Sequence, residues 1–420
     1  MSTPLAPLIP DLRAQFPALA RRENGQPAVF LDGPAGTQVP QSVIDAMSHY
    51  LSHCSANHGG QFPTGRESDA LLDEVHRGLA DFVGADDPEE IAFGQNMTSL
   101  TFAFSRALAR TWKPGDEIVV TLLDHDANVT PWVLAARDAG IKVQFVRFRS
   151  EDCTLDLDDI RAKINGRSKL VAVGCASNAT GGINPVRQIA DWAHEAGALV
   201  FADAVHFAPH GLVDVKALGV DFLACSAYKF FGPHIGVLWG NRKLMESMEA
   251  YKVRPANDSL PSKWMTGTQS HESMSGALAA VDYLAGIGRH LAGNAALPRR
   301  NALTAAYEAI VPYERSLVSR LLAGLAEIPE IKVFGITDPS RFGERVATVS
   351  FTHQRFTSAQ LAERLGSRGI FTWHGNYYAL NLSEQLGHEP HGMLRVGLVH
   401  YNTAEEVERL LAELRQLESQ

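Results

Sequence analysis

The chain is poor in cysteine and has no long uninterrupted apolar run. Its 4 cysteines among 420 residues show no CxxC spacing and are too few to staple a chain this long, so we expect reduced thiols and no cysteine metal site. No apolar run approaches the roughly 18 residues that span a bilayer. Prolines interrupt the N-terminal segment where a signal peptide needs a continuous apolar core. These absences predict a cytoplasmic protein without a membrane-spanning segment.

A basic excess is also missing. The chain has 38 Lys and Arg against 47 Asp and Glu, a net charge of −9, which argues against a nucleic-acid surface because such surfaces cluster positive charge to neutralise phosphates. Hydrophobic residues make up 45% of the chain and charged residues 20%, a composition typical of folded proteins. The length is ample for two or three domains.

Between about residues 85 and 245, short apolar runs alternate with amphipathic stretches. This pattern is typical of βα units around a mostly parallel, doubly wound sheet. We expect helices over 98–110, 131–139 and 185–196, and strands over 90–95, 117–124, 142–148, 169–177, 199–206, 222–229 and 237–240. Sheets of this kind bind ligands at the carboxyl ends of their strands.

After about residue 295 the pattern changes. A long helix is expected over 301–328, followed by strands over 346–352 and 393–399 and a closing helix over 404–417. This order predicts a smaller α+β domain. We expect a large α/β domain over 20–295 and a small domain made of 1–19 and 296–420.

Three polar residues follow successive strands of the predicted large domain. Lys229 follows an apolar run, Asp203 lies about one βα unit earlier, and Asn178 about one unit before that. Singly, Lys229 could be a surface lysine and Asp203 a helix N-cap. Together they could face one crevice, with a desolvated amine able to form a Schiff base and a carboxylate able to keep a pyridine nitrogen protonated.

These residues carry a family resemblance. Ser177-Asn178, Asp203 with His206, and Ser226 to Lys229 before Gly232-Pro233 resemble the pyridoxal-phosphate site of the class V aminotransferase family, nearest its cysteine desulfurase-like branch. The similarity runs from Phe16-Pro17 to Tyr401-Asn402-Thr403. It implies the fold type I architecture of pyridoxal-phosphate enzymes, a homodimer with shared active sites, and a small amino-acid substrate.

The resemblance implies a role for each residue around the cofactor ring. Lys229 would hold pyridoxal 5'-phosphate as a Schiff base and move the Cα proton, while Asp203 would pair with the ring nitrogen. His125 would stack on the ring, although a loop histidine alone is more often hydrogen-bonded surface. Asn178 would bond the 3'-oxygen, near His206, where many relatives have glutamine.

The phosphate and the substrate would have their own residues. Met97 and Thr98, with Ser226, would hold the phosphate at a helix start, although a helix N-cap explains that stretch as well. Thr268, which could also be an ordinary turn residue, would reach the phosphate of the neighbouring subunit. Arg395 interrupts an apolar strand and would bind the substrate carboxylate, with an internal salt bridge as the alternative.

The chain departs from desulfurases in one respect. No cysteine lies beyond Cys225, and Tyr378 stands near the position of the persulfide cysteine. Arg66 could replace a missing N-terminal arginine or be a surface residue. We therefore favour a lyase that eliminates a sulfur- or selenium-containing β-substituent. The alternatives are an aminotransferase, a desulfurase using another thiol, and a non-catalytic binding protein of the same fold.

Overall fold

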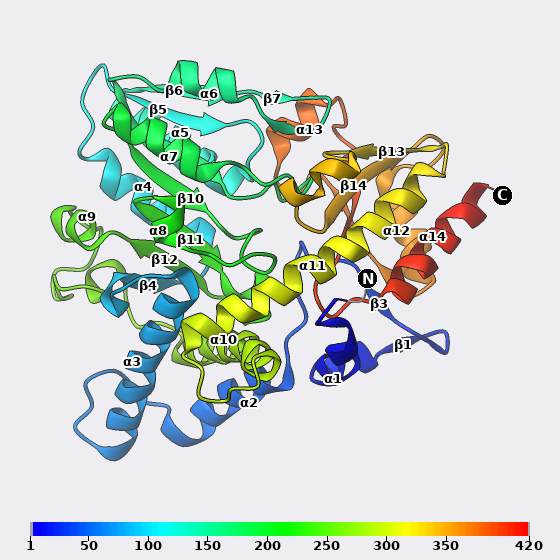
Figure 1. Cartoon of the computed structure of the whole chain (residues 1–420). Helices are drawn as coiled ribbons and strands as arrows, with labels where there is room; N and C mark the ends of the chain where they lie inside the picture. Colours follow the sequence, from blue (N-terminus) through cyan, green and yellow to red (C-terminus); the bar gives the residue numbers. More distant parts are fainter. Residues whose placement is uncertain (1–2, 419–420) are drawn as a thin grey trace.

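A computed structural model describes residues 3–418. Its larger sheet has seven strands (Figure 1), in the order β4 (Ile91–Gly94), β12 (Gly236–Gly240), β11 (Phe222–Ser226), β10 (Leu199–Asp203), β9 (Ser168–Gly174), β5 (Glu117–Thr121) and β6 (Lys142–Val146). Strand β12 is antiparallel to both neighbours, and the other pairs are parallel. The predicted mostly parallel sheet is confirmed.

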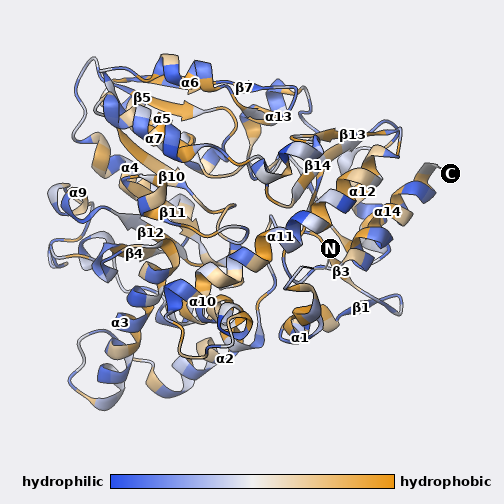
Figure 2. Cartoon of the chain, in the orientation of Figure 1, coloured by the Kyte–Doolittle hydropathy of each residue, from blue (hydrophilic) through white to orange (hydrophobic). Residues whose placement is uncertain are grey.

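Helices cover both faces of this sheet. Phe201 of β10 contacts Phe104 of α4 (Met97–Ala109) and Trp132 of α5 (Thr130–Ala139). Its neighbours Val200 and Ala202 belong to a separate core, because successive strand side chains point to opposite faces. On that side α7 (Val186–Glu195) packs against β9 and β10. Accordingly, Figure 2 colours strands such as β5 and β10 largely as hydrophobic, whereas α14 mixes both classes.

The smaller sheet is antiparallel and has the order β13 (Ile331–Phe334), β14 (Thr348–His353), β17 (Met393–Gly397) and β16 (Trp373–Gly375). Helix α11 (Arg299–Ala326) runs from the neighbourhood of α10 (His271–Leu291) towards this sheet (Figure 1). Near the N-terminus, β3 (Val29–Phe30) pairs with β15 (Ile370–Phe371).

The remaining elements are two-residue strands and helices of various lengths. No helix within residues 3–418 is both long enough and apolar enough to cross a membrane. The remaining α-helices are α1 (Ile9–Ala14), α2 (Gln41–His49), α3 (Pro63–Val83), α6 (Leu157–Lys163), α8 (Val215–Leu218), α9 (Arg242–Ser247), α12 (Ser358–Ser367), α13 (Leu380–Gln385) and α14 (Ala404–Glu418). The remaining strands are β1 (Arg22–Glu23), β2 (Gln26–Pro27), β7 (Phe148–Arg149) and β8 (Thr154–Leu155).

The expected strands 199–206 and 222–229 extend too far. Strand β10 ends at Asp203, and β11 ends at Ser226, so Lys229 lies in a short 3-10 helix, Ala227–Lys229, rather than in a strand. On both segments, buried residues continue beyond the last residue that is hydrogen-bonded in the sheet. The apolar pattern alone therefore does not show where the strands end. The segments that leave the ladder carry the candidate site residues.

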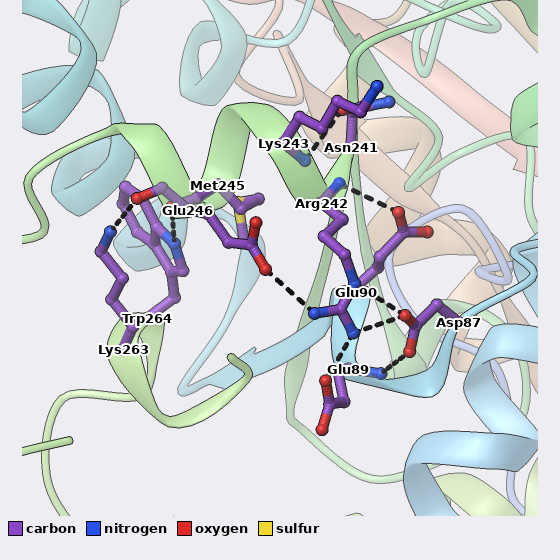
Figure 3. A network of polar contacts seen from close by, with 10 residues as sticks. All are labelled: Asp87, Glu89, Glu90, Asn241, Arg242, Lys243, Met245, Glu246, Lys263 and Trp264. Carbon is purple, nitrogen blue, oxygen red and sulfur yellow. Dashed lines mark hydrogen bonds and ion pairs between the residues drawn. The ribbon is translucent and has the colours of Figure 1, made fainter. Parts of the chain in front are cut away.

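An ion-pair network joins the β4 edge of the seven-stranded sheet to α9. The guanidinium of Arg242 bonds the carboxylates of Asp87 (2.8 Å) and Glu246 (3.0 Å), as Figure 3 shows. Glu90 accepts hydrogen bonds from the Arg242 backbone (2.9 Å) and from the Trp239 indole (2.9 Å). Glu90 directly precedes β4 and Trp239 belongs to β12, so these bonds connect the ends of two neighbouring strands and stabilise the edge opposite β6.

Candidate active site

A cavity of about 200 Å³ lies beside the carboxyl ends of β9, β10 and β11, with residues of the smaller sheet on its other side. This is the edge at which open α/β sheets bind ligands. The structure brings nine of the ten residues predicted for the site to its wall: Met97, Thr98, His125, Asn178, Asp203, His206, Ser226, Lys229 and Arg395.

The Lys229 amine is the nucleophile that the cavity offers. Its Nζ donates hydrogen bonds to the backbone oxygens of Pro34 and of Ala35, the latter at 3.1 Å. Burial lowers the pKa of Lys229 to about 7, with Arg395 acting in the same direction and Asp203 against it. A large fraction of the amine is therefore unprotonated at neutral pH and can attack a carbonyl carbon.

Two buried carboxyl groups lie close together in the cavity. Asp203 accepts a hydrogen bond from the Val205 backbone (2.8 Å), and burial raises its pKa to about 6. Burial and repulsion by Asp203 raise the pKa of Asp124 to about 7. Asp203 has no ion-pair partner among residues 3–418, so this pair of acids is suited to a cation or a charged N–H donor.

Sequence reasoning missed Asp124. It directly precedes His125, and its Oδ2 accepts hydrogen bonds from the Gly174 backbone (2.8 Å) and the Asn128 side chain (3.0 Å). Both bonds fix the start of the loop that carries His125. A carboxylate immediately after an apolar strand was the signal that could have identified it.

His125 presents a neutral ring. Its Nδ1 accepts a hydrogen bond from the Ala127 backbone (3.0 Å). Burial lowers the pKa of His125 to about 4, and the nearby cations Lys229 and Arg395 add to this effect. The ring lies nearly parallel to that of Tyr378, with centroids 5.3 Å apart. A neutral, fixed imidazole is suited to stacking on another planar ring.

Asn178 and His206 supply polar groups to the cavity from the segments that follow β9 and β10. The Asn178 Nδ2 donates to the Tyr377 backbone oxygen (2.9 Å), whereas its Oδ1 is buried without a partner. His206 Nε2 is 3.0 Å from the Thr348 hydroxyl, and burial holds the pKa of His206 well below its usual value. The unpaired Asn178 oxygen can accept a hydrogen bond from a bound hydroxyl.

The start of α4 provides an anion site. Asn96 caps the helix by accepting from the Ser99 backbone (2.9 Å), and the Ser226 hydroxyl accepts from the Met97 backbone (3.1 Å). Thr98 is exposed in the first turn. A Cβ at Gly236 would lie 2.4 Å from the Asn96 carbonyl carbon, so glycine lets β12 approach this helix start closely. Backbone N–H groups and hydroxyls at a helix N-terminus suit a phosphate.

Arg395 is a buried cation without an acidic partner. Its guanidinium donates to the Asn178 backbone oxygen (2.8 Å) and lies 4.2 Å from the centre of the Tyr377 ring, but its Nε is buried and unbonded. Burial lowers the pKa of Arg395 to about 10. Asp32 acts on Arg395 electrostatically and raises its pKa, but no ion pair within 4.0 Å forms with Arg395 among residues 3–418. A carboxylate ligand would satisfy this group.

Two further residues lie away from the cavity. Thr268 is exposed in the loop that precedes α10, and Arg66 is exposed in the first turns of α3. Neither lines the cavity of its own chain. The role of Thr268 towards a neighbouring subunit stays a prediction.

The unmet groups around the cavity fit pyridoxal phosphate with an amino-acid substrate. Asp203 can accept from a protonated ring nitrogen, Asn178 can bond a ring hydroxyl, Thr98 at the start of α4 can bind a phosphate, and Lys229 offers an amine. Arg395 then remains for the substrate carboxylate.

Comparison with known proteins agrees with this fit. A family model described as aminotransferase class-V matches residues 29–410. A cysteine desulfurase of Pectobacterium atrosepticum is 31% identical over 97% of this chain and 98% of its own length. An aminotransferase-like protein of Gibberella zeae is 32% identical over 97% of both chains.

Solved structures show the same relationship. The apo structure of a cysteine desulfurase from Thermococcus onnurineus matches with a TM-score of 0.86 and 28% identity, over 99% of this chain and 98% of that one. A cysteine desulfurase of Escherichia coli matches with a TM-score of 0.82 and 27% identity, over 98% of both. The chain therefore belongs to the class V aminotransferase family and is a pyridoxal-phosphate-dependent enzyme of fold type I.

Proposed function

We propose that this enzyme is a lyase that eliminates a β-substituent, with sulfur or selenium favoured, from an L-amino acid held by its carboxylate. The observation that carries the proposal is the lack of a thiol at the cavity. None of the four cysteines lines it, and Tyr378 stands where the loop faces His125. The family resemblance further supports a homodimer in which Thr268 reaches the second active site.

The four thiols are poorly suited to carry sulfur. All of them are buried. Burial raises the pKa of Cys153 to about 11 and raises the pKa values of the other three thiols as well. A persulfide carrier must attack as the thiolate and must reach the substrate. Buried protonated thiols outside the cavity meet neither requirement.

The residues of the cavity divide the work of an elimination. Bound pyridoxal phosphate supplies a carbonyl carbon for amines and a protonated ring that withdraws electrons from Cα. Lys229 would hold the cofactor through its amine and is placed to take the Cα proton of a bound substrate. Asp203 would accept a hydrogen bond from the ring nitrogen and favour its protonated state. Arg395 orients the substrate through its carboxylate.

The reaction balances without a second organic substrate. The Cα proton is removed, the bond from Cβ to the substituent breaks, and the substituent leaves with the bonding electrons. The released enamine reacts with water to give a keto acid and ammonia. Transamination needs a second keto acid, and desulfurase chemistry needs a thiol acceptor. Elimination therefore needs neither a second keto acid nor a thiol, and the groups that face this cavity suffice for it.

Products from L-cysteine and from a panel of S-substituted cysteines test the proposal. We expect equal amounts of pyruvate, ammonia and the released thiol or sulfide. Alanine with a protein-bound persulfide would restore desulfurase chemistry. A strict requirement for an added keto acid, or no keto acid from any member of the panel, would also overturn elimination.

A variant with all four cysteines replaced by alanine or serine serves as the control in this assay. Its turnover should stay within about threefold of wild type. Because the side chains are buried, each replacement should cost about 1–2 kcal/mol of stability, so thermal unfolding of the holoenzyme is measured beside activity. A loss of more than about a hundredfold in a folded variant would mean that one thiol takes part.

Replacing Arg395 with glutamine should weaken substrate binding. The lost charge-assisted hydrogen bonds correspond to a rise in KM of about 10- to 100-fold, with a smaller change in kcat. The KM of Arg395→Lys should lie between those of wild type and Arg395→Gln, since lysine keeps the charge but not the two-pronged geometry. An unchanged KM in Arg395→Gln would show that the carboxylate binds elsewhere.

A further inference from the structure

Exposed aromatic side chains stand at the mouth of the cavity. Tyr378 is 73% exposed and Trp373 is 52% exposed, and both line the cavity that holds Lys229. Leu380, 41% exposed, follows on the same segment. Large apolar side chains gathered at the rim of a site are typical of a surface that binds a ligand. None of the chemical roles assigned above uses these rings.

The backbone that presents Tyr378 is strained. Tyr377 and Tyr378 have φ of 56° and 59°, in the left-handed region that bulky residues rarely adopt. Strain of this kind persists only where the surroundings fix it, and it concentrates at functional sites.

Hydrogen bonds from the larger sheet's loops hold this turn. The Tyr378 backbone oxygen accepts from the Asp126 backbone (2.7 Å), and the Tyr377 backbone oxygen accepts from Asn178 (2.9 Å). The Tyr378 backbone N–H donates to the Asn376 side chain (3.1 Å), and the Tyr377 hydroxyl donates to the Met393 backbone oxygen. The Tyr378 ring is thereby held beside His125.

We propose that Tyr378 is a specificity-determining residue, whose ring, with that of Trp373, receives an aromatic or extended apolar β-substituent of the substrate. This inference refines the elimination reaction and rests on it. Arg395 would bind the carboxylate and Lys229 would act at Cα, which leaves the open mouth for the substituent. The wall there is formed by Tyr378 and Trp373, and the Tyr378 ring lies beside that of His125. Such rings favour planar and apolar groups.

The geometry of the mouth also allows a large substituent. In the single chain 73% of the Tyr378 side chain is exposed, so this ring borders an opening of the cavity. A substituent that passes this ring can extend outwards while its inner atoms contact the aromatic faces. A small substituent such as a thiol has little apolar area with which to contact these rings.

Binding of two unreactive amino acids to the holoenzyme tests the wall separately from elimination. L-Phenylalanine and L-alanine share the carboxylate and amine but lack a β leaving group, and their dissociation constants can be read from the cofactor's visible spectrum. We expect phenylalanine to bind about tenfold more tightly than alanine. Tyr378→Ala should reduce this preference to about twofold or less, while Tyr378→Phe should keep it.

Two further variants make the result specific. Tyr378→Asn removes the ring but suits a positive φ, so it should lose the preference without loss of folding. Tyr251→Ala removes a tyrosine that is 50% exposed and lies outside the cavity, and it should keep the preference. In product assays, the KM for S-methyl-cysteine should exceed the KM for S-phenyl-cysteine by the same factor as the dissociation constants of alanine and phenylalanine differ.

Three outcomes would overturn the proposal. They are an unchanged preference in Tyr378→Ala and Tyr378→Asn, equal weakening of both ligands in these variants, and a change in oligomeric mass, which would assign the exposed ring to a subunit interface. If phenylalanine binding behaves as expected but no substrate yields a keto acid, the aromatic wall stands and the elimination reaction fails.

Discussion

Replacing Lys229 with alanine should abolish covalent attachment of pyridoxal phosphate and lower turnover by at least about four orders of magnitude. One side chain is assigned two roles, covalent attachment of the cofactor and removal of the Cα proton, so both are lost together. Lys229 is the one lysine that lines the cavity of the described chain. Borohydride reduction of the wild-type holoenzyme followed by peptide mapping should place the cofactor on this residue.

The pKa of Lys229 gives this prediction a pH dependence. Burial lowers it to about 7, and only the unprotonated amine attacks a carbonyl carbon. The unprotonated fraction rises about tenfold between pH 6 and pH 8 for a group of this pKa. Attachment of added cofactor to the cofactor-free chain should therefore accelerate by about that factor over the same range.

A second buried lysine provides the matched control. Lys263 donates to the Glu246 backbone oxygen at 2.6 Å, in the network of Figure 3, and does not line the cavity. Lys263→Ala should retain the visible absorption band and near wild-type turnover. A reduced cofactor found on any lysine other than Lys229 would refute the assignment.

The central strands were predictable because β9, β10 and β11 are covered on both faces, which leaves uninterrupted apolar runs in the sequence. The grouping of Asn178, Asp203 and Lys229 followed from the same pattern, since parallel strands end at one edge. The points at which the strands end were not predictable, because burial continues beyond the hydrogen-bonded ladder.

Other features of the site depend on contacts between distant segments. The left-handed turn at Tyr377 and Tyr378 contains no glycine, so its sequence gives no signal for it. Its conformation depends on a hydrogen bond from Asn178, which lies 199 residues before Tyr377, and on one from Asp126, which lies earlier still. The environment of Asp124 likewise depends on Gly174 and Asp203 from neighbouring strands.

Replacing Asp203 with alanine should leave some cofactor bound but slow Cα deprotonation by a factor of about 100 or more. Removing one partner of a buried charged pair costs about 3–5 kcal/mol, and about 1.4 kcal/mol corresponds to a factor of ten in rate. Without the Asp203 carboxylate, the ring nitrogen loses the acceptor that favours its protonated state. The loss should appear in kcat, measured as the rate of α-proton exchange with solvent in D₂O.

The neighbouring Asp124 decides how this result is interpreted. Its Oδ2 is already engaged by the Gly174 backbone and Asn128, so it should not replace Asp203. Asp124→Asn keeps the shape and an acceptor oxygen, and we expect it to slow exchange by less than about tenfold because its effect passes through the position of His125. Wild-type exchange in Asp203→Ala together with a large loss in Asp124→Asn would assign the ring nitrogen to Asp124 instead.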